Sequence, residues 1–129
     1  MRFKGKTIFI TGGSRGIGLA VIKKLACDGA NIIIAAKTTV PHPKLPGTIF
    51  TAAKEVEESG GCCLPIECDI RFENSVTKAL EAGADKFGGI DICINNASAV
   101  APFPTPTTDM KRYDLMHDIN TRGTFMVTK

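Results

Sequence analysis

The stretch TGGSRGIG, residues 11–18, decides the fold because of what stands on either side of it. The residues that end at Thr11, KTIFIT, are β-branched and aromatic, which is typical of a buried strand. Beyond the stretch, Ile17, Val21 and Leu25 recur every fourth residue, which predicts a helix with one apolar face. The glycine-rich stretch is therefore expected to be a tight turn that leads from a strand into a helix.

Glycines at this turn suit the binding of an anion. Gly12 permits a turn that a side chain would block. Gly16 and Gly18 let the backbone come close to a pyrophosphate, which the start of the helix attracts through its unpaired N–H groups. The alternative is a simple strand-to-helix turn without a ligand. The candidate cofactor-binding residues of the turn are Gly12, Gly13, Ser14, Arg15, Gly16, Ile17 and Gly18.

Strands and helices alternate along the rest of the chain. Further strands are expected at 31–36, 62–67 and 91–95, and further helices at 48–59, at 73–87 and from Asp109 onward. Alternation of this kind predicts a parallel sheet with helices on both faces. Right-handed crossovers then favour the strand order 3-2-1-4.

The alternation stops after four strand–helix units. The predicted fold class is therefore α/β, the N-terminal half of a doubly wound, Rossmann-type parallel sheet, with residues 1–129 as one incomplete half-domain. Pro65 has no N–H for a sheet ladder, which indicates that the third strand lies at an edge. In the second helix, Phe50, Ala53 and Val56 are expected to face inward.

Composition excludes several classes of protein. The net charge of +3 is too small to argue for nucleic acid binding. Residues 1–27 nevertheless carry basic side chains and no acid, either as solvated helix faces or as a positive field over an anionic ligand. Nothing in the sequence resembles a signal peptide, and no apolar stretch is expected to span a membrane.

Five cysteines are an odd number, without the spacing of a zinc site. Buried free thiols in a reducing, intracellular compartment are expected, and no metal site is assigned. Cys62 and Cys63 are adjacent in a strand and should point to opposite faces of the sheet.

The motifs together resemble the short-chain dehydrogenase/reductase family. The turn has the spacing T-G-x-x-x-G-x-G, and NNAS at 95–98 follows the fourth strand, with Ser98 where the family has glycine. The resemblance implies that Asp69 lies beside the adenine ring and that Asn96 contacts the cofactor. It also implies that Asn120 is the asparagine of the catalytic tetrad, within a proton relay. The alternative for Asn120 is an amide that is satisfied inside the core.

Two basic side chains favour NADP(H) as the cofactor. An acid at the end of the second strand would bind the ribose 2′-hydroxyl and repel a 2′-phosphate. The residue at this place is Lys37, and Arg15 stands in the glycine turn. Both suit the 2′-phosphate, although each can also be read as a solvated surface charge.

The remaining catalytic residues of the family cannot be assigned in this chain. Tyr113 is the only tyrosine, and His117 stands where a Y-x-x-x-K motif needs lysine. His42 and His117 are given no chemistry. The expected parent is an NADP-dependent oxidoreductase that acts on a carbonyl or alcohol, with a lipid as candidate substrate, and residues 1–129 are expected to supply cofactor binding only. The alternative is a short, non-catalytic product that binds a nucleotide or a partner.

A closer resemblance, to one longer member of the family, rests on AAKTTVPHPKLPGTIFTAA at 35–53, together with NNASA and INTRGT. It implies a peroxisomal protein whose address signal is not in this chain, with the mitochondrion or cytoplasm as alternatives. Assembly with a second copy of the chain stays open.

Overall fold

Four parallel strands form the centre of the protein. The structure is a computed structural model that describes all residues, 1–129. The strands are β1 (Thr7–Thr11), β2 (Asn31–Ala36), β3 (Cys62–Glu67) and β4 (Ile92–Ile94). Their order in the sheet is β3-β2-β1-β4, and all three pairings are parallel, so the predicted topology is confirmed. Pro65 lies in β3, which is an edge strand as expected.

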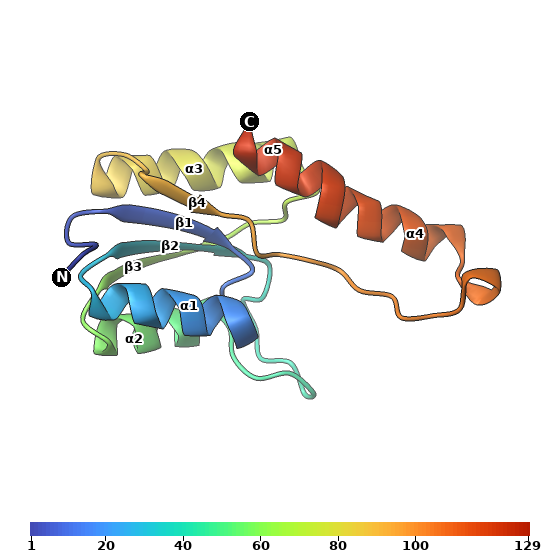
Figure 1. The fold of residues 1–129 in the computed structure, drawn as a ribbon, viewed down its shortest axis with the longest axis horizontal. Coiled ribbons are helices and arrows are strands. Elements are labelled where there is room, and N and C mark those ends of the chain that lie inside the picture. Colours follow the sequence, from blue (N-terminus) through green and yellow to red (C-terminus); the bar gives the residue numbers. More distant parts are fainter.

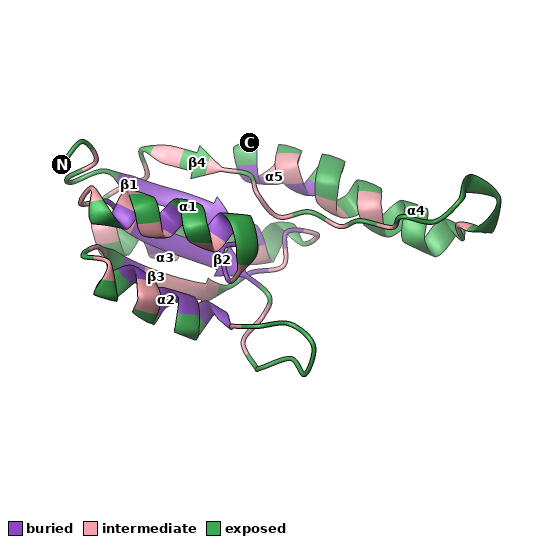
Figure 2. Cartoon of the chain, turned by 60° about the horizontal axis from the view of Figure 1, so that its bottom comes forward, coloured by how far each residue is buried: buried purple, intermediate pink, exposed green.

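Helices cover both faces of this sheet (Figure 1). On one face lie α1 (Gly16–Cys27) and α2 (Ile49–Glu58), and on the other lie α3 (Glu73–Phe87) and α5 (Thr124–Thr128). The side chains of β1 alternate between the two layers, because successive residues of a strand point to opposite faces. Ile8 and Ile10 pack under α1 and α2, while Phe9 packs under α3 and α5. Figure 2 shows the buried residues concentrated on β1 and β2.

The buried face of α1 differs from the prediction. The helix buries Gly18, Ile22 and Ala26, whereas Ile17 is 79% exposed and Val21 is 37% exposed. Small residues let the helix approach the sheet closely, and that close approach decides the rotation of the helix about its axis. The prediction considered only large apolar side chains and placed Ile17 and Val21 on the buried face. This part of the prediction was wrong.

A similar correction applies to α2. Phe50 is 55% exposed, not inward as predicted, while Ala53 and Val56 are buried as expected. Ile49 is buried in place of Phe50. The helix is capped by Thr48, whose side chain accepts hydrogen bonds from the backbone N–H groups of Phe50 and Thr51. This N-cap orients the first turn so that Ile49 faces the sheet.

The end of the chain forms an arm that projects from the body (Figure 1). After β4, an extended segment contains the short 3₁₀ turn η1 (Thr105–Thr107) and leads into α4 (Met110–His117). A π-helical turn, η2 (Asp118–Gly123), joins α4 to α5. The predicted start of this helix is confirmed, because Asp109 caps α4 by accepting a hydrogen bond from the N–H of Arg112.

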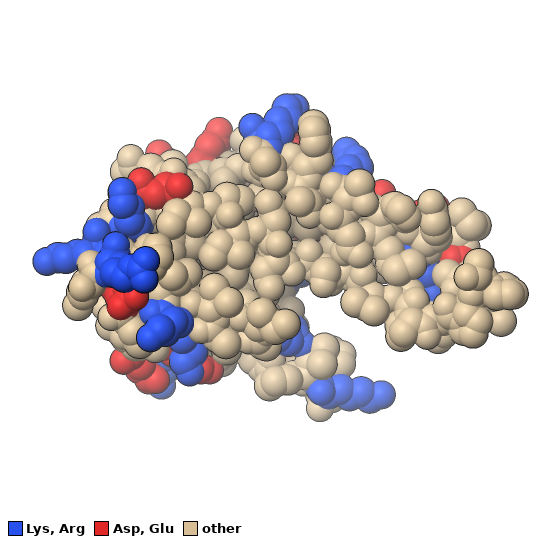
Figure 3. All heavy atoms as spheres, in the orientation of Figure 1, with Lys and Arg blue, Asp and Glu red and all other residues tan.

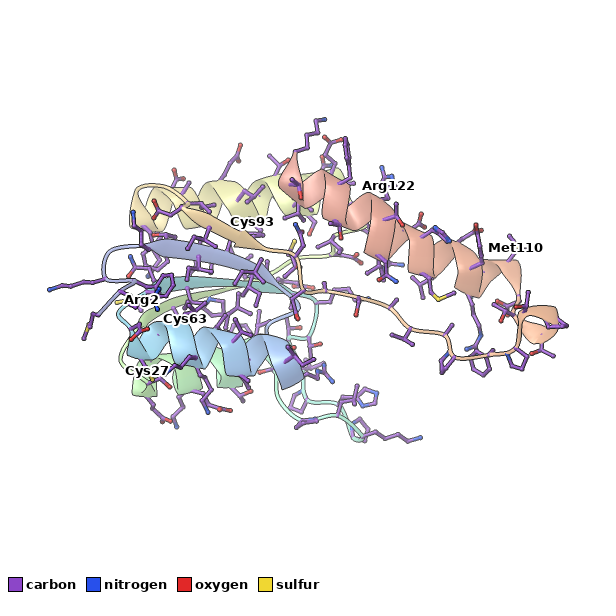
Figure 4. All side chains as sticks on the ribbon, viewed as in Figure 1. Arg2, Cys27, Cys63, Cys93, Met110 and Arg122 are labelled. Atoms are coloured by element: carbon purple, nitrogen blue, oxygen red, sulfur yellow. The ribbon has the colours of Figure 1, made fainter.

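All five cysteines are free thiols, but the expectation that they are buried holds for only two. Cys63 and Cys68 are buried, whereas Cys27, Cys62 and Cys93 are exposed. Figure 4 shows Cys27, Cys63 and Cys93 on three separate elements. Cys62 and Cys63 face opposite sides of β3 as predicted, one exposed and one buried.

Candidate functional site

A cleft of about 440 Å³ opens at the carboxyl ends of the strands. Its walls come from the glycine turn, from the residues that follow β2, β3 and β4, and from Ile119 of η2. The chain order reverses at β1, which has β2 on one side and β4 on the other. A crevice at this point is where open α/β sheets bind their ligands. All the predicted cofactor-binding residues line the cleft except Gly13, which is buried against Ile10 and Ile22.

The glycines of the turn serve two purposes. Gly12 and Gly16 have φ angles of +69° and +56°, which favour glycine. A Cβ atom on Gly16 would meet nothing within 4 Å, so its backbone is open to a ligand. At Gly18, in contrast, a Cβ atom would lie 2.6 Å from Nδ2 of Asn96. Gly18 is therefore required first by packing inside the site, not only by the approach of a ligand as the sequence suggested.

Asn96 holds the glycine turn in place. Its Nδ2 donates to the carbonyl oxygens of Thr11 and Gly12, at 3.1 Å and 3.0 Å. In return, Oγ1 of the buried Thr11 accepts from the backbone N–H groups of Asn96 and Ala97. The ends of β1 and β4 are thereby fixed to each other, and these hydrogen bonds hold the turn in its shape.

The start of α1 leaves donors free at the cleft. No side chain caps this helix, and its first turn contains no acidic residue. The first N–H groups of a helix have no partner within the helix, and they carry the positive end of its dipole. Gly16, Ile17 and Gly18 lie in this first turn and line the cleft. The arrangement suits an anionic ligand.

Arg15 brings a positive charge with unused hydrogen-bonding capacity into the cleft. Its Nη2 donates to Oγ1 of Thr38 at 2.8 Å, while Nη1 is buried and has no partner. Lys37 lines the same cleft and is exposed. Neither cation belongs to an ion pair. Because Arg15 and Lys37 both line the cleft, this corner suits an anionic group with several acceptor oxygens.

The other basic residues in the first 27 positions lie outside the cleft. Lys6 directly precedes β1, at the opposite end of the strands from the cleft. Figure 3 shows basic side chains gathered at that end, which holds the N-terminus. Lys23 forms an ion pair with Glu55 on the neighbouring helix. These charges are solvated surface charges, and only Arg15 of the early basic residues reaches the cleft.

Asp69 follows β3 and places a carboxylate on the cleft wall. The guanidinium of Arg71 binds both of its oxygens, with Nη2 at 2.6 Å from Oδ2 and Nε at 3.0 Å from Oδ1. These hydrogen bonds lower the pKa of Asp69 below its ordinary value. The carboxylate is therefore ionised and can accept a hydrogen bond from a ligand at neutral pH.

Asn120 lies outside the cleft lining, although the neighbouring Ile119 is part of it. The Asn120 amide makes two hydrogen bonds of 2.8 Å with the backbone of Ala99, donating to the carbonyl and accepting from the N–H. The amide is therefore satisfied by hydrogen bonds, as the alternative expects, but it is exposed in residues 1–129 and does not lie inside the core. Asn120 sits in the π-helical turn, a feature that is frequent at functional sites.

Tyr113 lies on the projecting helix, where its ring centroid is 4.3 Å from that of His117. Neither side chain lines the cleft, and His42 also lies outside it. The structure brings no three His, Cys, Asp or Glu side chains together in a way that could hold a metal ion. None of its helices combines the length and the apolar character needed to cross a membrane.

Sequence reasoning missed two threonines that shape the site. Thr11 accepts the hydrogen bonds that join β1 to β4, and Thr38 orients Arg15. Both stand at the carboxyl end of a predicted strand, where binding residues are expected in parallel sheets. Their position was a usable signal, but their partners depend on how the strands are paired.

The fold and the cleft define a Rossmann-type, dinucleotide-binding α/β protein. Residues 6–129 match the family model described as short chain dehydrogenase. The chain therefore belongs to the short-chain dehydrogenase/reductase family, whose members are oxidoreductases that bind nicotinamide dinucleotides.

The chain is 56% identical, over 128 residues, to hydroxysteroid dehydrogenase-like protein 2 from Xenopus laevis, a match that covers 99% of this chain and 31% of the relative. The structure of a short chain dehydrogenase from Mycobacterium thermoresistibile has a TM-score of 0.94 and 56% identity, covering 97% of this chain and 45% of that one. An NAD⁺-bound xylitol dehydrogenase has a TM-score of 0.88 and 27% identity, covering 99% and 47%. The chain thus spans less than half of these relatives.

Proposed function

We propose that residues 1–129 form the NADP(H)-binding half of an oxidoreductase that interconverts a carbonyl and an alcohol. The preference for NADP over NAD rests on the part of the cleft that lies between Arg15 and Lys37. It holds two cations that line the cleft and form no salt bridge. No acid stands at the end of β2, where a carboxylate would select the 2′-hydroxyl of NAD.

The 2′-phosphate supplies what this corner lacks. Phosphate oxygens can accept hydrogen bonds from the guanidinium of Arg15 and from the exposed ammonium of Lys37, because both residues line the cleft. Hydrogen bonds to charged groups contribute roughly 1.5–3 kcal/mol each. Since 1.4 kcal/mol is about a tenfold change in affinity, two such bonds give a clear preference for NADP over NAD.

The rest of the cleft accommodates the remaining parts of the dinucleotide. The free N–H groups at the start of α1 suit the pyrophosphate, and Asp69 suits the amino group of adenine. Asn96 keeps the turn in its binding shape through its hydrogen bonds to Thr11 and Gly12. When bound, the nicotinamide supplies or takes up the hydride of the reaction.

Proton transfer needs groups that residues 1–129 do not bring to the cleft. Tyr113, the only tyrosine, contacts His117 in the arm. Asn120 is an amide and cannot supply the proton that an alkoxide requires. We therefore assign cofactor binding to these residues, and proton transfer and substrate binding to the rest of the full-length protein. The similarity to hydroxysteroid dehydrogenase-like protein 2 supports a lipid alcohol or ketone as substrate, and a peroxisomal location belongs to the same proposal.

The cofactor preference is tested by titrating NADPH and NADH against the full-length protein. The wild type should bind NADPH at least about tenfold more tightly than NADH. Lys37→Asp should weaken the binding of NADPH and strengthen that of NADH, because a carboxylate repels the 2′-phosphate and accepts from the 2′-hydroxyl.

Lys44→Asp is the matched control. Lys44 stands in the same exposed loop after β2 but does not line the cleft, so the same charge change there should leave the preference intact. Equal affinity of the wild type for the two cofactors would overturn the assignment.

A further inference from the structure

Arg71 lies outside the cleft but controls a group on its wall. Its guanidinium meets both oxygens of Asp69, through Nε at 3.0 Å and 3.2 Å and through Nη2 at 2.6 Å. Its backbone N–H also donates to Oδ1 of Asp69 at 3.1 Å. Asp69 lines the cleft, whereas Arg71 does not. One residue therefore fixes the direction in which the carboxylate presents its remaining lone pairs.

The pair is held from further sides as well. The backbone N–H of Asp69 donates to Oγ of Ser75 on α3, at 2.9 Å. The backbone carbonyl of Arg71 accepts from Nη1 of Arg122 at 2.9 Å, and Arg122 belongs to η2, the turn that also brings Ile119 to the cleft. Figure 4 shows Arg122 on the helix that carries the end of the chain. These bonds connect Asp69 to α3 directly and, through Arg71, to η2.

Such an anchored carboxylate has a definite chemical preference. An ionised carboxylate only accepts hydrogen bonds, so it favours a ligand that presents an N–H donor. A base with an amino group at this position is bound, whereas a base with a carbonyl oxygen brings two acceptors together. The preference requires that the carboxylate cannot turn away, and the bidentate geometry with Arg71 prevents that turn.

We propose that Arg71 is a positioning residue that holds the Asp69 carboxylate toward the cleft, so that the site selects a 6-aminopurine over a 6-oxopurine. The proposal rests on the proposed function, because it assumes that the purine of a dinucleotide occupies this part of the cleft. Arg71 acts through Asp69 and does not itself touch the ligand.

The test compares two cofactors that differ only at this position of the base. NADPH and the reduced nicotinamide hypoxanthine dinucleotide phosphate are titrated against the full-length protein, with binding followed by the fluorescence of the reduced nicotinamide. The wild type should bind NADPH about tenfold more tightly than the hypoxanthine analogue. Arg71→Ala should bring the ratio of the two dissociation constants close to one, and Arg71→Lys, which keeps one donor, should retain part of it.

Arg112→Ala is the matched control, since Arg112 also pairs with a nearby aspartate, Asp109, but in the arm. It should keep the wild-type ratio. Asp69→Asn is a second variant, of nearly the same shape as the wild type. It should lose the preference for NADPH over the hypoxanthine analogue, as Arg71→Ala does. Thermal unfolding of each variant checks that the site is folded, and if Arg71→Ala does not fold, Arg71→Lys decides: a ratio equal to that of the wild type would overturn the proposal.

Failure of this proposal can be told from failure of the proposed function. A ratio unchanged in Arg71→Ala, with both cofactors weakened equally, would show that Arg71 only stabilises the fold and would overturn the proposal. A second outcome is that the wild type binds NADPH and NADH equally, while Arg71→Ala still loses the preference for NADPH over the hypoxanthine analogue. In that case the assignment of the 2′-phosphate fails and the role of Arg71 stands. Binding of neither dinucleotide would overturn both.

Discussion

At the scale of single residues, Cys62 and Cys63 show how one step along a strand changes side-chain chemistry. Cys62 is exposed, whereas Cys63 is 6% exposed and packs under α2. Burial raises the pKa of Cys63 from its ordinary 9.0 to about 12, because the thiolate loses its hydration. The native state therefore holds this proton at a pH where the unfolded chain releases it.

This difference predicts a loss of stability in alkali. Between about pH 9 and pH 12 the unfolded state binds fewer protons at Cys63 than the native state, so the free energy of unfolding falls as pH rises. The fall amounts to about 1.4 kcal/mol per pH unit. In Cys63→Ala the loss between about pH 8 and about pH 10.5 should be smaller than in the wild type by about 2 kcal/mol.

Urea unfolding at the two pH values measures this loss. Comparing each variant with itself removes the cost of the cavity that Cys63→Ala creates. Cys62→Ala is the control and should lose as much stability as the wild type. The same alkaline loss in Cys63→Ala as in the wild type would show that this thiol does not hold its proton.

Some residues around the cleft could be predicted from the sequence, and others could not. The glycine turn has fixed spacing and a fixed place after β1, so its position at the cleft followed from the sequence alone. The role of Thr38 did not, because its contact with Arg15 joins residues 23 positions apart. The Arg71–Asp69 pair was also missed, since two charges near each other in a sequence form an ion pair only if the local backbone brings them together.

At the scale of elements, the order of strands and helices was predictable because it rests on long, strongly patterned segments. The rotation of α1 was not, because it depends on the tight contact of Gly18 with Asn96, which is brought by β4 from far along the chain. In α2 the N-cap at Thr48 fixes the first turn, and its hydrogen bonds predict a measurable contribution to stability. The Thr48 N–H also donates to Oγ1 of Thr51, which completes a reciprocal cap.

Thr48→Ala should lower the free energy of unfolding by about 1 kcal/mol, because the first N–H groups of α2 lose their acceptor. Equilibrium unfolding in urea measures the change. Thr77→Ala, at an exposed position inside α3, is the matched control and should be neutral or slightly stabilising, since alanine has the higher helix propensity. Equal effects at the two positions would rule out a special role for the cap.

At the scale of the whole molecule, the sheet and the arm present unpartnered surfaces in these 129 residues. β4 pairs only with β1, so its outer edge carries free backbone groups. The arm exposes Phe103, Met110 and Tyr113, each by at least 46% of its accessible surface. Exposed edges and apolar side chains favour pairing with another chain.

A polypeptide of residues 1–129 alone should therefore self-associate or be poorly soluble. Sedimentation velocity at several micromolar concentrations should show species larger than the monomer that grow with concentration. A single monomeric species with a sharp, cooperative thermal transition would contradict this expectation. The edge was predictable from the strand order, whereas the projecting arm was not, because a helix pattern does not tell how far from the sheet the helix lies.

The central claim is that the cleft at the carboxyl ends of the strands binds NADP(H), with the 2′-phosphate between Arg15 and Lys37. A crystal structure of the full-length protein with NADP⁺ tests it most directly. The 2′-phosphate is predicted within hydrogen-bond distance of the guanidinium of Arg15 and of Nζ of Lys37, with the pyrophosphate at the start of α1. An adenosine ribose turned away from these two side chains, or a cofactor bound outside this cleft, would contradict the claim.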